Sequence, residues 1–175
     1  MREILLYIAT SLDGKIARKD HSLDWLPPID EAGEDYGYKE MLDTVDAVLM
    51  GYSTYEICMG LGEWPYKQLK SYVFSRNAGK PVIPEAELVN EDPVTFTNKL
   101  KETAGKNIWL IGGGDIIRQL HDGGLIDKYM IATIPVILGE GIALFPGIKK
   151  EQKLSVVHHK AYNNLIMTHY AKTAE

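Results

Sequence analysis

The hydrophobic positions of the chain fall into short blocks separated by glycine, proline and acidic residues. Residues 3–10 (EILLYIAT) form an almost unbroken apolar run that ends at the turn-like sequence SLDG. Such runs are typical of strands covered on both faces, which usually belong to parallel or mixed sheets flanked by helices. Further strand-like runs occupy residues 45–50, 71–75, 86–90, 107–111 and 129–134.

Helical patterns lie between these runs. Ser53 and Glu56 have the S-x-x-E spacing of a capping box, which predicts the start of a helix just after the second strand. Asp92 before Pro93 supplies a cap residue followed by proline at the first helical position. The predicted helices span about residues 34–43, 52–60, 93–104 and 115–121.

The C-terminal part of the chain has a different pattern. Residues 153–160 and 165–172 are two strand-like runs joined by only four residues, so they can form only an antiparallel hairpin. The sequence therefore predicts an α/β fold with a mixed, mostly parallel central sheet, flanking helices and a C-terminal antiparallel hairpin. At 175 residues the chain is expected to be one domain spanning residues 1–175.

Composition excludes several classes of function. The formal net charge of -5 argues against a nucleic-acid partner, because phosphate backbones require a basic face. Cys58 is the only cysteine, so neither a disulfide framework nor a cysteine-based zinc site is possible. His158 and His159 are neighbours on a predicted strand and point to opposite faces, and no metal site is expected. No apolar run approaches the ~18 residues of a membrane span or resembles a signal peptide, which favours a cytoplasmic protein without a membrane partner.

The stretch WLIGGGDIIRQL at residues 109–120 places three glycines between a strand and a helix. It is neither a Rossmann fingerprint, since Ile117 stands where the last glycine belongs, nor a P-loop, which ends in G-K-[ST]. Bare backbone N–H groups at a helix N-terminus suit a pyrophosphate, whereas tight packing of helix on sheet would also require glycine. A second junction of this kind at residues 51–54 (GYST) predicts that the two could hold one dinucleotide.

Four blocks of sequence carry a family resemblance. They are YIATSLDGKIA at 7–17, DAVLMGYSTYE at 46–56, VFSR at 73–76 and IWLIGGGDIIRQL…GLIDKYMIATIPVILGEGIALF at 108–145. With them the chain resembles the dihydrofolate reductase-like superfamily, and most closely the reductase domain of riboflavin biosynthesis (the RibD C-terminal domain) and its stand-alone relatives. The resemblance implies a mixed eight-stranded sheet, an NADPH site across the strand ends, and a homodimer. The zinc deaminase signature that accompanies this domain in the full riboflavin enzyme is absent.

The resemblance also assigns residues to NADPH. They are Ile8, Ala9 and Ile16 for the nicotinamide; Gly51, Tyr52, Ser53 and Thr54 together with Gly112, Gly113, Gly114, Asp115 and Ile116 for the pyrophosphate; and Ser75 and Arg76 for the adenosine 2′-phosphate. Two positions depart from the family pattern. Tyr52 stands where the relatives usually have an arginine, so preference for NADPH over NADH rests on Arg76, with Lys80 as a second cation. Asp127-Lys128 replaces the usual Asp-Glu, which inverts one charge.

In a reductase of this kind the nicotinamide passes a hydride to an electrophilic carbon, and the protein positions and protonates the substrate. Two carboxylates are candidates for the catalytic acid. Asp35, with Asp30 and Glu34 as neighbours, matches the spacing of the pterin-binding acid of dihydrofolate reductases, and it equally suits a helix N-terminus. Asp13 lies in the SLDG block that borders the substrate in riboflavin-type reductases, and it equally suits an ordinary turn.

The expected function is NADPH-dependent reduction of a pyrimidine- or pterin-like small molecule, as in 5-amino-6-(5-phosphoribosylamino)uracil reductase or dihydrofolate reductase. A reductase of the same fold with an unrelated small substrate is one alternative. A non-catalytic nucleotide- or small-molecule-binding protein that retains the fold is the other.

Overall fold

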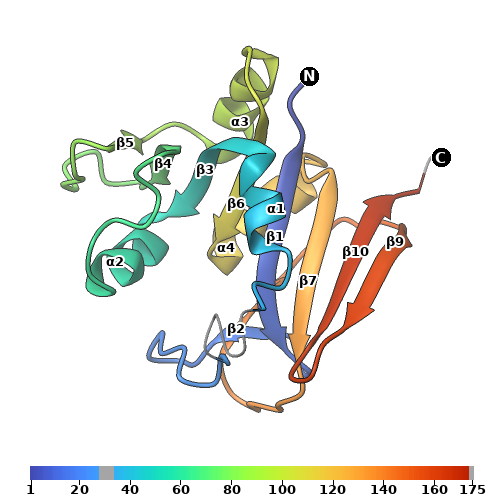
Figure 1. Cartoon of the computed structure of the whole chain (residues 1–175). Helices are drawn as coiled ribbons and strands as arrows, with labels where there is room; N and C mark the ends of the chain where they lie inside the picture. The colour runs from blue at the N-terminus through green and yellow to red at the C-terminus, as the bar shows by residue number, and fades with distance from the viewer. Residues whose placement is uncertain (28–33, 174–175) are drawn as a thin grey trace.

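One twisted sheet runs through the molecule in the order β5-β4-β3-β6-β1-β7-β10-β9 (Figure 1). The structure is a computed structural model and describes residues 1–27 and 34–173. Within these ranges the sheet has eight strands: β1 Ile4–Ser11, β3 Val45–Gly51, β4 Lys70–Phe74, β5 Ala86–Val89, β6 Asn107–Gly112, β7 Lys128–Ile134, β9 Leu154–Ala161 and β10 Ile166–Lys172.

The strands from β5 to β7 are parallel, and β10 alone among the eight runs in the opposite direction. Ile4 of β1 lies opposite Ile108 of β6, and Leu6 lies opposite Tyr129 of β7, both in parallel register. The β10 strand is antiparallel to β7, and β9 is antiparallel to β10. The predicted fold class, with its C-terminal antiparallel hairpin, is therefore confirmed.

A second, two-stranded sheet was not predicted from the sequence. Its antiparallel strands are β2 Lys15–Ala17 and β8 Ile142–Ala143. Both segments are too short for a periodic signal, and each becomes a strand only because the fold brings the other beside it. This small sheet closes one side of the cavity described below.

The helices are α1 Tyr38–Asp43, α2 Tyr52–Gly60, α3 Pro93–Glu102 and α4 Gly114–Asp122. The α1 helix begins later than predicted, because Tyr36 and Gly37 have φ angles of 57° and 82°, which no α-helix can contain. The predicted capping box at Ser53 is wrong, since Gly51 is the residue before α2 and no side chain caps that helix. The prediction for α3 is confirmed, because the Asp92 carboxylate accepts a hydrogen bond from Thr95 N at 2.9 Å.

Both faces of the sheet are buried, which explains the unbroken apolar runs. Ile4 and Leu6 pack with α3 and α4 on one face, whereas Leu5 packs with α1 and α2 on the other. Strand β6 alternates in the same way, with Leu110 on the first face and Trp109 on the second. In Figure 1, α1 lies in front of the central strands.

The two residues Asp127 and Lys128, where the family pattern is altered, have different surroundings. The Asp127 carboxylate accepts hydrogen bonds from Ile4 N at 2.8 Å and from Nζ of the buried Lys101 at 2.5 Å. Lys128 Nζ pairs with Glu3 Oε2 at 2.6 Å on the surface. The lysine that inverts the family's charge is therefore matched by a carboxylate on the neighbouring β1 end.

These surroundings predict unequal effects of two neighbouring substitutions. Asp127→Ala removes the partner of a buried ammonium and is expected to lower the free energy of unfolding by roughly 3 kcal/mol. Lys128→Ala removes only an exposed pair and should change it by less than about 1 kcal/mol. Urea denaturation of both variants measures the difference. Equal effects would contradict the assignment of Asp127 as the partner that keeps Lys101 buried.

Candidate functional site

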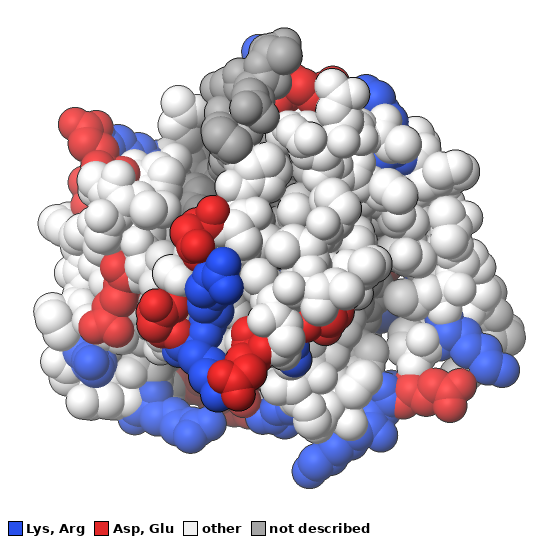
Figure 2. All heavy atoms as spheres, turned by 90° about the horizontal axis from the view of Figure 1, so that it is seen from below, with Lys and Arg blue, Asp and Glu red and all other residues white. Residues whose placement is uncertain are grey.

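A cavity of about 1030 Å³ opens at the edge of the sheet where the parallel strands end. Residues from β1, β2, α2, α4 and the ends of β4 and β5 line it. Ligands of α/β proteins bind at this edge because helix N-termini and loops converge there. Figure 2 looks at the molecule from that side, and it shows acidic and basic side chains gathered close together beside a broad uncharged region.

The two predicted strand–glycine–helix junctions meet in the middle of this cavity. A Cβ atom at Gly51 would lie 3.3 Å from Cγ1 of Ile116 and 3.9 Å from the backbone nitrogen of Gly113. A Cβ atom at Gly113 would in turn lie 3.3 Å from Oγ1 of Thr54. The starts of α2 and α4 therefore lie side by side, with free backbone N–H groups of two helix N-termini at one place.

Glycine occurs at each of these three consecutive positions for its own structural reason. Gly112 has a φ of 131°, which side-chain-bearing residues rarely adopt. Gly114 packs so closely that a Cβ atom would lie 2.7 Å from the carbonyl oxygen of Ala143. A Cβ atom at Gly113 would press against Thr54 of the other junction. Close packing therefore explains Gly114 and contributes at Gly113, and contact of Gly113 with a ligand stays a prediction.

Nearly all residues that the family resemblance assigned to NADPH line this one cavity. The lining includes Ile8, Ala9, Ile16, Gly51, Tyr52, Ser53, Thr54, Ser75, Arg76, Gly113, Gly114, Asp115 and Ile116. Gly112, the last residue of β6, is not part of the lining. The fold thus gathers positions that are up to about a hundred residues apart in sequence, which the sequence blocks alone could only suggest.

One end of the cavity is polar. The side chain of Arg76 is 93% exposed, and its guanidinium lies 3.5 Å from the Asp115 carboxylate at the start of α4. Asp115 is also paired with Arg118 at 2.7 Å, so Arg76 is not needed to neutralise it. Arg76 is therefore able to turn toward an anionic ligand with little loss of protein contacts.

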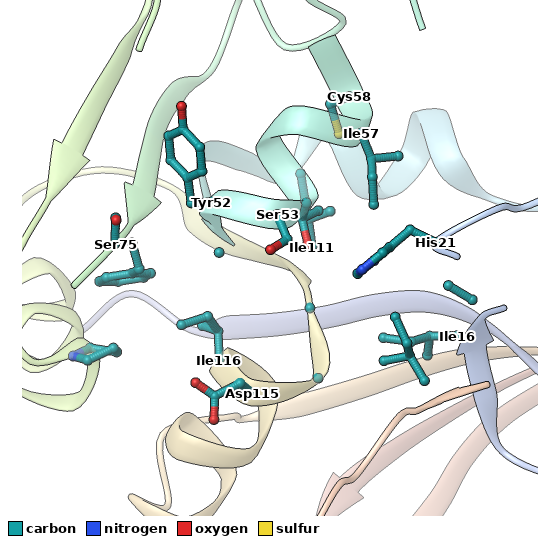
Figure 3. Close-up of a pocket in the computed structure, with 18 of the residues that line it drawn as sticks. Ile16, His21, Tyr52, Ser53, Ile57, Cys58, Ser75, Ile111, Asp115 and Ile116 are labelled. Atoms are coloured by element: carbon teal, nitrogen blue, oxygen red, sulfur yellow. The ribbon is translucent and has the colours of Figure 1, made fainter. Parts of the chain in front are cut away.

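Tyr52 does not take the place of the arginine found in relatives. Its hydroxyl donates a hydrogen bond to Pro81 O at 2.9 Å, and Lys80 Nζ lies over its ring at 4.5 Å from the centroid. In Figure 3 the ring projects away from Asp115 and Ile116. The Tyr52 side chain therefore contacts residues 80 and 81, and it is not directed at the place where the N-termini of α2 and α4 meet.

Neither predicted catalytic carboxylate lines the cavity. Asp13 accepts hydrogen bonds from Ser11 Oγ at 2.7 Å and from the backbone nitrogens of Leu138 and Gly139 at 3.0 and 2.8 Å. These bonds, that of Ser11 first, lower the pKa of Asp13 to about 2. They tie the turn after β1 to the segment that leads toward β8. This geometry favours the turn interpretation of Asp13, and a catalytic role stays a prediction without support from the cavity.

Asp35 also has a structural position. Its two carboxylate oxygens accept hydrogen bonds from Lys39 N and Gly37 N, each at 3.0 Å, and these bonds lower its pKa. Glu34 lies beside it and accepts from Tyr36 N, whereas Asp30 falls outside the described residues. The geometry thus favours the helix N-terminus interpretation of Asp35, and a catalytic role stays a prediction without support from the cavity.

His21 is a cavity residue that the sequence analysis missed. It lies in a turn after β2, and its ring points into the cavity beside Ile16 and Ile57 (Figure 3). Its φ of 68° is unusual for a residue with a side chain, and such conformations cluster at functional sites. The only sequence signal was one histidine in an acidic loop. Cys58 also lines the cavity as a buried thiol, and burial raises its pKa.

Two further classes of site are absent from the described residues. No group of three or more His, Cys, Asp or Glu side chains is arranged to hold a metal ion. None of the described helices has the length and apolar character that a membrane crossing requires.

The sheet order and the paired glycine junctions define a dihydrofolate reductase-like fold of the RibD type. The sequence pattern of the RibD C-terminal domain matches residues 2–168, so the chain belongs to that family. A relative from Bacillus subtilis (strain 168), named Uncharacterized protein YwjB, is 38% identical over 172 residues and covers 98% of both chains.

Two solved structures extend the comparison. A putative riboflavin biosynthesis protein from Shewanella sp. PV-4 has a TM-score of 0.84 and 29% identity, covering 99% of this chain and 100% of its own. A deaminase/5-amino-6-(5-phosphoribosylamino)uracil reductase from Thermotoga maritima has a TM-score of 0.73 and 18% identity, and its match covers 98% of this chain but 57% of its own. The second likeness shows the fold only.

The lowered pKa of Asp13 predicts how its contribution to stability depends on pH. A carboxyl group whose pKa is lower in the folded than in the unfolded chain stabilises the fold above the unfolded value, here near 3.8, and loses this effect as the pH falls through about 2. We expect Asp13→Asn to lower the melting temperature at neutral pH and the difference from the wild type to shrink between pH 4 and pH 2. Thermal unfolding across this range measures it. A difference that stays constant in acid would show that the ionised carboxylate is not the cause.

Proposed function

We propose that this chain is an NADPH-dependent reductase that transfers a hydride to a pyrimidine- or pterin-like small molecule. The observation that carries the proposal is the meeting of two helix N-termini, those of α2 and α4, in one cavity at the carboxyl edge of the sheet. Each N-terminus presents unpaired backbone N–H groups and the positive end of a helix dipole, and together they suit the two phosphates of a dinucleotide.

The rest of the cavity fits the same ligand. Ile8 and Ala9 at the end of β1 would place a nicotinamide against apolar backbone, so that its C4 faces the end of the cavity lined by Ile16 and Ile57. Ser75 and Arg76 would lie at the adenosine end. The cofactor supplies the hydride, while this chain binds it, orients it and keeps water from the reacting carbon.

Direct titration with NADPH and NADH, followed by cofactor fluorescence, tests the proposal. Binding of NADPH together with its oxidation in the presence of a pyrimidine or pterin substrate supports it. Failure of both cofactors to bind at millimolar concentration overturns it. Tight binding without hydride transfer to any acceptor would instead favour the alternative of a binding protein that retains the reductase fold.

The choice between NADPH and NADH is expected to depend on Arg76. An arginine–phosphate hydrogen bond contributes roughly 1.5–3 kcal/mol when shielded from water, and less at an exposed side chain. Arg76→Ala should therefore raise the Kd for NADPH by about tenfold and leave the Kd for NADH within about twofold. Arg118→Ala removes a nearby guanidinium outside the cavity lining; because Arg118 pairs with Asp115, this control should change the Kd for NADPH and for NADH alike.

Tyr52→Arg tests the same site in the opposite direction. It restores the arginine that relatives have, and we expect tighter NADPH binding with little change for NADH. Equal gains for both cofactors, or an Arg76→Ala effect that is the same for both, would show that the 2′-phosphate is not recognised here.

We also propose that two copies of the chain associate through β9. This strand is one edge of the sheet, and all of its residues are exposed, including Leu154, Val156 and Val157. A long apolar edge promotes aggregation unless it is covered, and identical edges can pair about a two-fold axis. A second copy is therefore the partner that this edge fits best.

Sedimentation velocity measures this association. We expect a dimer for the wild type and a monomer for a Val156→Lys, Val157→Lys double variant. Leu12→Lys changes an equally exposed apolar residue elsewhere and should remain dimeric. A monomeric wild type would contradict the proposal.

A further inference from the structure

The two ends of the cavity differ in chemistry. Arg76, Asn77, Asn90 and Asp92 line the end beyond the glycine junctions, next to β4 and β5. The opposite end, beyond the predicted nicotinamide position, is formed mainly by apolar side chains: Ile16, Leu23, Leu26, Ile57, Leu61 and Ile111. At about 1030 Å³ the cavity is at the top of the ~300–1,000 Å³ range of single-ligand pockets, which leaves room for a substrate beside a dinucleotide.

No lysine or arginine is among the described residues that line the apolar end. The nearby Arg18 is held by Asp24, with Nε and NH2 at 2.6 and 3.2 Å from its two oxygens, and Lys19 is paired with Glu140 at 2.8 Å. Lys15 precedes Ile16 on β2, so its side chain points to the other side of the strand. Residues 20–27, which contribute His21, Leu23 and Leu26 to this wall, contain no lysine or arginine.

The other polar side chains at this end do not supply the paired, charged donors that a phosphate requires. Tyr66 and Cys58 contact each other, with Oη and Sγ 3.9 Å apart, and burial raises the pKa of both. His21 is the remaining polar side chain, and no described residue hydrogen-bonds its imidazole. One imidazole can meet a single polar atom of a ligand, but it lacks the paired donors with which arginine binds phosphate.

The turn that carries His21 is held in place by several bonds. Its own N–H donates to Arg18 O at 3.0 Å, and Arg18 N donates to Ser22 O at 3.1 Å. Ser22 N in turn donates to the Asp20 carboxylate at 3.0 Å. This network fixes the left-handed conformation of His21 and keeps its ring directed into the apolar end (Figure 3).

We propose that the substrate of this site is an uncharged, mainly apolar and flat molecule that carries neither a phosphate nor a carboxylate group, and that His21 contacts its one polar edge. The inference rests on the proposed function, since it assumes that a dinucleotide fills the polar end and the glycine junctions. A phosphate buried against the apolar wall would lose its hydration without gaining a cation or a helix N-terminus. The site would therefore discriminate against phosphorylated pyrimidines and against pterins with an anionic tail.

The test compares two fluorescent bicyclic probes of pterin size, 2-naphthol and 2-naphthyl phosphate, on protein saturated with NADP⁺. The dinucleotide occupies the two helix N-termini, so the phosphate probe cannot bind there instead. We expect the neutral probe to bind with a Kd at least about tenfold lower than that of the phosphate, because an unpaired charge is costly in an apolar pocket.

Ile57→Lys places a cation on the half-buried face of α2 that lines the apolar end, and it should reverse the preference in favour of the phosphate. Leu12→Lys adds the same charge outside the cavity lining and should leave the preference unchanged. Equal or tighter binding of the phosphate by the wild type overturns the inference. So does failure of 2-naphthol to bind at millimolar concentration.

Titration of the dinucleotide by itself precedes the probe measurements, and this order separates the two ideas. If NADP⁺ and NADPH do not bind, the proposed function fails before any probe is added. If they bind and the phosphate probe is preferred, only the inference about the substrate fails.

Discussion

The close approach of the strand ends at Gly51 and Gly113 is the constraint on which the rest of the site depends. Neither position can carry a side chain without displacing Ile116 or Thr54. Because α2 packs on one face of the sheet and α4 on the other, their N-termini can meet only at the edge between β3 and β6. The meeting creates a place where unpaired backbone N–H groups from both faces point into one cavity.

The place where the N-termini of α2 and α4 meet also divides the cavity into two chemical environments. On one side the ends of β4 and β5 supply polar groups and the exposed Arg76. On the other side the small β2–β8 sheet, α2 and the turn of His21 supply an apolar wall with one imidazole. A bound dinucleotide that spans the meeting point of the two helices would present its reactive ring to this apolar side.

The surroundings of the candidate acidic residues could not be predicted from the sequence. The resemblance made Asp13 and Asp35 candidates for a catalytic acid, yet both oxygens of each carboxylate accept hydrogen bonds from backbone N–H groups outside the cavity lining. These bonds form with short loops whose geometry leaves little trace in the residue pattern. His21 had no such pattern either, and it reaches the cavity because a turn closed by Arg18 fixes an unusual backbone angle.

The sequence by itself determined the main strands, the order of helices and strands, the C-terminal hairpin and the two glycine junctions. Those features depend on local periodicity and on short motifs, which neighbouring residues specify. Only the tertiary structure decided that Gly51 and Gly113 touch, that β2 pairs with β8, and that Lys128 meets Glu3. Each of these contacts joins segments distant in the chain, and their geometry is fixed by packing of the whole sheet rather than by any one segment.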